Sequence, residues 1–245
     1  LSFKIEHSIL WLVAYTAASL LFYIIVSIWN PKKPLLRTLK NAKRVLIVTA
    51  HPDDERNHSD LGKTRKYELY EACKVLGISE DRITIHNDQF LPDNPNVMWK
   101  EDLIGSIIMN YVQSLNVDTL VSFDKQGISQ HPNHKAIYYA IAYLVMENQL
   151  PSYCRAYTLE TVNIFRKYSL FLDIPISFLS SSYWSILNWK ERKRIQKAMK
   201  EHNSQMVWFR SLYITFSRYM LVNTLEEITF HNTLNNLSQE EDKEN

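Results

Sequence analysis

In this 245-residue chain, the stretch RVLIVTAHPDDE, residues 44–55, is the strongest indication of the fold class. Its first half, residues 44–49, is a short apolar run rich in β-branched side chains, which predicts a buried strand of a parallel sheet. The polar residues 51–55 follow at once, so they lie at the carboxyl end of that strand. Because α/β folds bind their ligands at this end of the strands, the stretch predicts a functional site as well as a fold class.

Strand-like and helix-like segments alternate downstream of this stretch. Apolar residues at helical spacing before Gly77 predict a helix that ends at this glycine. The other predicted elements are strands at 83–85 and 119–123, helices at 103–115, 134–146 and 190–201, and a proline-rich loop at 88–99. This alternation predicts an α/β fold of the Rossmann-like kind, with a mostly parallel sheet and flanking helices.

Residues 9–28 are twenty consecutive residues without a charge, which is enough to cross a bilayer core about 30 Å thick. A secretory signal peptide would have a shorter apolar core and a cleavage site, so a transmembrane anchor at 1–30 is the favoured interpretation. Lysines and arginines crowd the linker at 31–43, and this excess of positive charge predicts that the rest of the chain faces the cytosol.

The remaining chain is predicted to form one catalytic domain at 44–225 and an acidic, disordered tail at 226–245. Within the domain, residues 205–221 interleave aromatic and basic side chains. Two interpretations stay open for this segment, a helix packed in the core and a helix that lies on the bilayer.

Overall composition excludes several classes of protein. The formal net charge of +2 gives no sign of nucleic-acid binding. The two cysteines, Cys73 and Cys154, lie far apart and without a C-x-x-C spacing, which argues against a disulfide framework and against a cysteine-based zinc site.

A second polar cluster, His131-Pro132-Asn133-His134, follows the predicted strand 119–123. The carboxyl ends of parallel strands share one edge of a sheet, so this cluster and residues 51–55 are expected to converge. Histidine and carboxylate side chains that meet in this way suit a catalytic zinc ion, which leaves one position for water. Taken singly, each cluster is also compatible with a turn or a helix cap.

The pairing of A-H-P-D-D-E with a downstream H-P-x-H resembles the LmbE-like de-N-acetylases. Four stretches, at 62–78, 123–134, 158–168 and 205–220, resemble the branch of that family that acts on glycolipids. The resemblance implies that His51, Asp54 and His134 bind the metal, zinc or another divalent ion. It also implies that Asp53 is the general base and that His131, in its protonated form, stabilises the oxyanion.

The same resemblance implies a substrate and a location. The substrate would be the glycolipid N-acetylglucosaminyl-phosphatidylinositol, and the reaction the second step of GPI-anchor synthesis, at the cytosolic face of the endoplasmic reticulum membrane. Two alternatives are a deacetylase of a soluble N-acetylglucosaminyl conjugate and an inactive membrane protein that acts by binding a partner.

The chain departs from its relatives at two places. The second cluster is usually preceded by glycine, whereas this chain has Gln130. Only six residues separate Glu55 from Gly62, so one βα unit is predicted to be missing, which would uncover part of the sheet. Separately, we expect Asp124 to orient one of the imidazoles, as carboxylates commonly do at metal sites.

Overall fold

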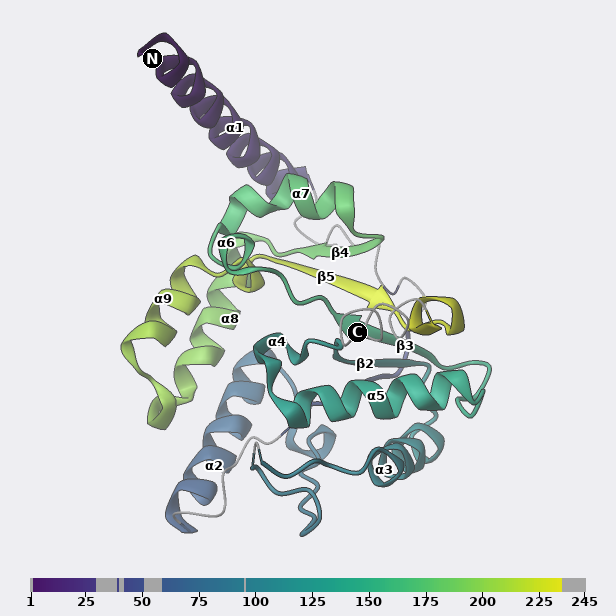
Figure 1. Cartoon of the computed structure of the whole chain (residues 1–245). Helices are drawn as coiled ribbons and strands as arrows, with labels where there is room; N and C mark the ends of the chain where they lie inside the picture. Colours follow the sequence, from purple (N-terminus) through teal and green to yellow (C-terminus); the bar gives the residue numbers. More distant parts are fainter. Residues whose placement is uncertain (1, 30–38, 40–41, 51–58, 95, 235–245) are drawn as a thin grey trace. The chain divides into compact units, whose positions relative to one another are not determined.

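A computed structural model describes residues 2–29, 39, 42–50, 59–94 and 96–234 (Figure 1). Two compact units make up the chain. Unit 1 consists of Leu1–Thr38, Tyr67–Ile83 and Val162–Thr224, and unit 2 consists of Leu39–Lys66, Thr84–Thr161 and Leu225–Asn245. These units differ from the predicted division into an anchor, a linker, one catalytic domain and a tail.

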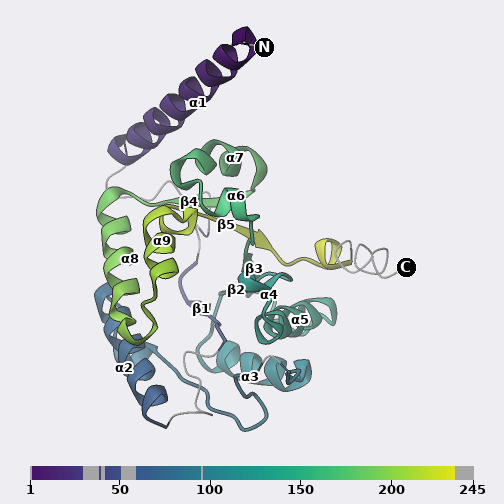
Figure 2. The same cartoon turned by 60° about the vertical axis from the view of Figure 1, so that its left-hand side comes forward.

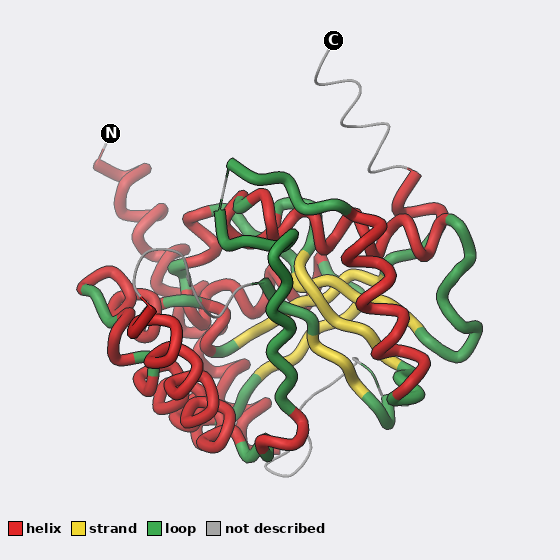
Figure 3. The backbone as a smooth tube through the Cα atoms, turned by 90° about the horizontal axis from the view of Figure 1, so that it is seen from below, coloured by secondary structure: helices red, strands yellow, loops and turns green. Residues whose placement is uncertain are grey.

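Five strands form a single sheet in the order β1-β2-β3-β5-β4. Figure 3 shows the strands in yellow and the helices in red. They are β1 (Val45–Ile47), β2 (Thr119–Phe123), β3 (Arg155–Leu159), β4 (Tyr183–Ile186) and β5 (Val222–Glu227). The first three are parallel, whereas β5 runs antiparallel to β3. The predicted α/β fold with flanking helices is therefore confirmed, with a mixed sheet. The predicted strand at 83–85 is wrong, because these residues follow the short helix η1 (Glu80–Arg82) without joining the sheet.

Unit 2 places three helices beside β1, β2 and β3. In Figure 1, α5 (Pro132–Met146) lies along β2 and β3, and α3 (Glu101–Ser114) packs against α5; the short helix α4 (Gly127–Gln130) precedes α5. Val112, Leu120 and Ile141 are fully buried between these elements. The predicted helices at 103–115 and 134–146 and the strand at 119–123 are confirmed, with α5 beginning two residues early.

β1 lies at an edge of the sheet rather than in its interior. Leu46 and Val48 face the core of unit 2, while Val45 and Ile47 on the opposite face are 47% and 65% exposed. The prediction of a buried strand is therefore wrong for one face of β1. This exposure agrees with the predicted loss of a βα unit, because a missing neighbour leaves both an edge and a face uncovered.

Unit 1 is built mainly from helices. Its elements include α6 (Ile164–Lys167), η2 (Leu170–Leu172), α7 (Asp173–Ser180), α8 (Trp189–Glu201), η3 (Asn203–Gln205), α9 (Trp208–Phe216) and η4 (Arg218–Met220). Its core contains Ile174, Trp184 and Val222. The predicted helix at 190–201 is confirmed as α8, and α2 (Ser59–Leu76) ends before Gly77 as expected, because that glycine adopts a φ of +85°.

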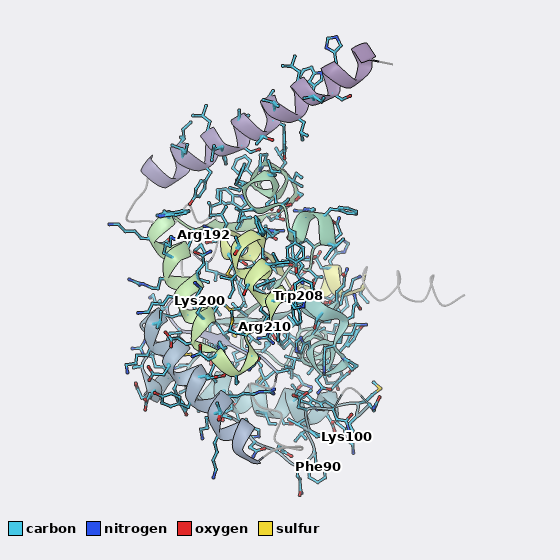
Figure 4. All side chains as sticks on the ribbon, turned by 90° about the vertical axis from the view of Figure 1, so that its left-hand side faces the viewer. Phe90, Lys100, Arg192, Lys200, Trp208 and Arg210 are labelled. Atoms are coloured by element: carbon cyan, nitrogen blue, oxygen red, sulfur yellow. The ribbon has the colours of Figure 1, made fainter. Side chains whose placement is uncertain are left out.

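α1 (Ser2–Trp29) contains one stretch, His7–Ile25, that is long and apolar enough to cross a membrane. α9 occupies the middle of the predicted aromatic segment. Figure 4 shows Trp208 and Arg210 on this helix, and Trp208 is 76% exposed while Ile214 is buried. Packing in the core therefore accounts for only one face of α9.

β5 extends past the predicted start of the tail. Glu226 and Glu227 pair with Thr158 and Tyr157 of β3, and Ile228 is buried. The predicted boundary at 226 is wrong, because these glutamates belong to a strand. Residues 235–245 lie outside the described residues.

Candidate functional site

The loop after β2 is held by the carboxylate of Asp124. Its Oδ1 accepts hydrogen bonds from the Thr161 hydroxyl at 2.7 Å and from the Gln126 amide at 3.1 Å, and its Oδ2 accepts one from the Thr161 amide at 2.6 Å. The Asp124 carbonyl also accepts the Gly127 amide at 2.8 Å. The Thr161 hydroxyl oxygen accepts the amide of Ile128 at 3.0 Å. One threonine of unit 2 therefore fixes both sides of this turn.

This turn places Gly127 next to His134, the last residue of the second polar cluster. The Gly127 carbonyl oxygen lies 2.9 Å from Nδ1 of His134. A Cβ atom added at Gly127 would lie 2.8 Å from the Cβ of His134, and the φ of +59° is also one that glycine adopts at little cost. Both the backbone conformation and the close approach require glycine at this position.

The environment of His134 fixes its tautomer and favours the neutral ring. A carbonyl oxygen only accepts hydrogen bonds, so Nδ1 of His134 must be the donor, and Nε2 of the neutral ring is then the nitrogen that carries the lone pair. The ring stacks on Phe123 with centroids 4.2 Å apart. Burial lowers the pKa of His134 and the nearby His131 adds to this effect, although the Gly127 carbonyl opposes it. The neutral form that metals require is therefore favoured.

His131 has a different role at the start of α5. Its Nδ1 accepts the Asn133 amide at 3.2 Å and so caps the helix, with Pro132 in the first turn. The His131 and His134 rings lie 5.0 Å apart between centroids. An accepting Nδ1 puts the proton of the neutral ring on Nε2, so His131 can donate a hydrogen bond without being charged.

Asn133 connects this cluster to the loop 88–99. The side chain is fully buried, and its amide group donates to the Pro92 carbonyl at 3.2 Å. The indole of Trp99 donates to the same carbonyl at 2.8 Å. The roles of Asn133, Gly127 and Thr161 were not predicted from the sequence. Gly127 lies within the stretch 123–134 that resembles the family, and a glycine there could have indicated a turn with a positive φ.

The segment between Gly127 and His131 contains two further residues in the left-handed region. Ile128 has a φ of +60° and Gln130 a φ of +63°. Such values are costly for residues with a Cβ atom. The family motif leads us to expect glycine at position 130, so the departure at Gln130 falls on a backbone conformation that favours glycine.

The first cluster is only partly covered by the structure. His51, Asp53 and Asp54 lie outside the described residues. Within the described part of the chain, no group of three or more potential ligands gathers at one place. β1 nonetheless pairs in parallel with β2, and the Val48 amide donates to the Val121 carbonyl at 2.9 Å. The predicted placement of both strand ends at one edge is therefore confirmed.

Asp124 acts differently from the prediction. Its oxygens accept from Thr161 and Gln126, whereas the Nδ1 atoms of His134 and His131 contact the Gly127 carbonyl and the Asn133 amide. The carboxylate therefore shapes the turn that presents the Gly127 carbonyl, and the carbonyl orients His134.

Comparison with known proteins identifies relatives along most of the chain. The N-acetylglucosaminyl-phosphatidylinositol de-N-acetylase of Bos taurus is 34% identical over 240 residues, which covers 85% of this chain and 95% of the bovine protein. A probable enzyme of the same name from Dictyostelium discoideum is 31% identical, covering 76% of this chain and 93% of its own.

A solved structure supports the fold. The N,N'-diacetylchitobiose deacetylase of Pyrococcus horikoshii matches with a TM-score of 0.52 and 14% identity, covering 84% of this chain and 91% of the other. Residues 55–145 match the model of the family described as PIG-L: GlcNAc-PI de-N-acetylase. Together with the two relatives that align with most of the chain, this match shows that the chain belongs to that family.

Proposed function

We propose that this chain hydrolyses the acetamide of N-acetylglucosaminyl-phosphatidylinositol and releases acetate and glucosaminyl-phosphatidylinositol. This is the second step of GPI-anchor biosynthesis. The observation that carries the proposal is the similarity to the bovine enzyme, which extends over 95% of that protein's length. The polar cluster at the end of β2 supplies side chains suited to the reaction.

A zinc ion is the proposed cofactor, held by His51, Asp54 and His134. The described residues fit this ion, because the Gly127 carbonyl engages Nδ1 of His134, the arrangement that commonly orients a histidine ligand of a metal. When bound, zinc lowers the pKa of water and polarises a carbonyl oxygen, which favours amide hydrolysis at neutral pH. A set of two imidazoles and one carboxylate also accepts other divalent ions.

Two residues handle protons and charge in the proposed reaction. Asp53 takes a proton from the attacking water and returns it to the glucosamine nitrogen as the C–N bond breaks. His131 donates a hydrogen bond from Nε2 to the acetamide oxygen as negative charge develops there. The cap at Asn133 supports this role for the neutral ring, whereas the sequence led us to expect the protonated one.

The proposed location is the endoplasmic reticulum membrane, with α1 as a single span and the catalytic part of the chain on the cytosolic side. The apolar stretch His7–Ile25 supports the span. The basic linker supports the orientation. A membrane anchor favours a lipid substrate over a soluble conjugate, because both are then confined to the same surface.

The test is acetate release by membranes that express this chain. The substrates are N-acetylglucosaminyl-phosphatidylinositol and, in parallel, a water-soluble N-acetylglucosamine conjugate in detergent. Asp53→Asn removes the proposed base with little change in size, and Glu71→Gln, a conservative change of a carboxylate on α2, is the matched control. We expect Asp53→Asn to abolish release and Glu71→Gln to leave it unchanged.

Three outcomes would contradict the proposal in different ways. Equal activity in Asp53→Asn would remove Asp53 as the base. Preference for the soluble conjugate would favour the alternative substrate. A chain that is present in the membrane and retains zinc but releases no acetate from either substrate would be an inactive member of the family.

A further inference from the structure

One face of α1 packs against the rest of unit 1. Tyr15, Ser19, Phe22 and Tyr23 are spaced by four, three and one residues, which places them on the same side of a helix. Ser19 is 1% exposed, and Phe22 and Tyr23 pack against the core of unit 1. The apolar side chains on the other faces, such as Leu21, remain exposed.

The partner of this face is the apolar segment Leu170–Ser180, formed by η2 and α7. The Tyr15 hydroxyl donates to the Leu172 carbonyl at 2.7 Å, and the Phe22 ring meets the Phe178 ring edge-on at 5.8 Å. Figures 1 and 2 both show α7 beside α1. This contact sets the level of α7 along the candidate span.

Along α1, the contact between Tyr15 and Leu172 lies well inside the candidate span. Tyr15 comes ten residues before Ile25, the end of the apolar stretch. At a rise of about 1.5 Å per residue, Leu172 lies roughly 15 Å below the end of the span, which is about half of a 30 Å bilayer core. Tilting α1 reduces this depth without bringing Leu172 out of the hydrocarbon.

The outward surface of this segment is apolar. Ile176, Phe178 and Leu179 of α7 are 43%, 45% and 83% exposed, and Ile164 and Phe165 of α6 are 59% and 85% exposed. An apolar patch of this kind on a soluble surface is unusual unless another surface covers it.

Two polar side chains of α7 face the protein interior rather than its surface. Asp173 and Ser177 are fully buried, and the Asp173 carboxylate pairs with Arg166 at 2.6 Å and with Arg218 at 3.0 Å. Lys167 lies beside aromatic rings, 5.4 Å from the centroid of Tyr213. The Asp173 charge is therefore matched within the protein, and Ile176, Phe178 and Leu179 of α7 carry no charge that would enter lipid with them.

We propose that the surface formed by Ile164, Phe165, Ile176, Phe178 and Leu179 inserts into the hydrocarbon of the leaflet that contains the second half of α1. The protein then contacts the membrane twice, through the span of α1 and through the apolar surface of α6 and α7. This inference rests on the proposed membrane span of α1. Lipid is the proposed occupant because α1, the proposed span, already lies beside α7.

The experiment uses the full chain in phosphatidylcholine–phosphatidylserine vesicles, with Cys73→Ser and Cys154→Ala as the background. A polarity-sensitive fluorophore is attached after Leu179→Cys or Phe165→Cys. Leu20→Cys on α1 reports on the span, and Lys200→Cys on the charged helix α8 serves as the aqueous control (Figure 4). Quenching by nitroxides on lipid acyl chains is compared with quenching by iodide in water.

We expect the acyl-chain nitroxides to quench the labels at 179 and 165, as they quench the label at 20. The label at 200 should be quenched only by iodide. Iodide quenching at 179 and 165, with lipid quenching at 20, would overturn the inference while the span stands. Iodide quenching at 20 would remove the span and the inference together. Protection from both quenchers at 179 and 165 would show that protein covers the patch, which also overturns insertion.

Discussion

The Gly127 carbonyl oxygen lies 2.9 Å from Nδ1 of His134, and the backbone of this glycine approaches His134 so closely that a Cβ atom would not fit. Gly127→Ala should therefore displace the imidazole as well as strain the backbone. We expect a loss of about 1–2 kcal/mol from the left-handed conformation alone, with an additional loss from the clash. Zinc affinity should fall as well, because the hydrogen bond that orients the ligand is disturbed.

Gly77→Ala is the matched control for this change. Gly77 also has a positive φ, but nothing lies within 4 Å of the position of an added Cβ. This variant should lose stability from backbone strain alone and keep its zinc affinity. Thermal unfolding and zinc titration of both variants separate the two effects. Equal zinc affinity in Gly127→Ala and wild type would show that the carbonyl does not position His134.

Thr161 should influence metal binding without contacting the metal. Its hydroxyl donates to Asp124 and accepts the amide of Ile128, and this pair of bonds fixes the turn that contains Gly127. Thr161→Val keeps the shape but removes both bonds. By analogy with other groups that support ligands, we expect zinc affinity to fall about 10–100-fold.

Thr161→Ser retains the hydroxyl and should restore zinc affinity close to that of wild type. Competition with a chelator measures the dissociation constant directly, independently of turnover. If the valine variant lost stability but bound zinc as tightly as the serine variant, Thr161 would be a purely structural residue.

Local sequence patterns predicted the elements of this fold well where packing agreed with periodicity. Helix α3 and strand β2 form as expected, because their apolar residues meet one core. The strand at 83–85 failed, since a β-branched run joins a sheet only if a neighbouring strand is available. For the same reason, nothing in residues 44–49 reveals that Val45 and Ile47 are left exposed at an edge.

The candidate site shows a similar division. The position of the second cluster after β2 was predicted from the sequence, because the carboxyl ends of parallel strands lie at one edge of the sheet. The function of Asp124 was misjudged, since residue type alone does not distinguish a carboxylate that binds an imidazole from one that binds a turn. Backbone groups such as the Gly127 carbonyl leave no signature in side-chain patterns.

Gln130 offers a test of backbone strain. Its φ of +63° lies in the region that glycine adopts freely. Gln130→Gly should raise the free energy of unfolding by up to about 1 kcal/mol, because relief of strain exceeds the added flexibility of the unfolded chain. Chemical denaturation measures this change. A less stable glycine variant would mean that the glutamine side chain contributes more than its backbone costs.

The buried ion pairs of unit 1 predict a large effect on stability. Asp173 is fully buried between Arg166 and Arg218. Asp173→Asn leaves Arg218 in the interior without its counter-charge, and removing one partner of a buried pair typically costs about 3–5 kcal/mol. Glu71→Gln, which breaks the exposed pair with Lys74, should cost less than about 1 kcal/mol. Similar melting temperatures for the two variants would contradict this difference.

The two cysteines should differ in reactivity. Burial, with a smaller contribution from Asp118, raises the pKa of Cys154 to about 11. Burial also raises the pKa of the partly buried Cys73. Because the thiolate is the reactive form, an alkylating reagent at pH 8 should modify Cys73 first in the folded protein. In guanidinium chloride both should react at similar rates, so faster reaction of Cys154 in the folded state would contradict the predicted environment.

The same pKa difference links Cys154 to stability at alkaline pH. The unfolded thiol loses its proton near its ordinary pKa of 9.0, whereas the folded thiol keeps it until about 11. Above pH 9 the unfolded state therefore binds fewer protons, and the free energy of unfolding falls as pH rises towards 11. Cys154→Ala removes this group, so its stability should decline less steeply than that of wild type over this window. Denaturation curves at several pH values test this, and parallel declines would show that the thiol does not contribute.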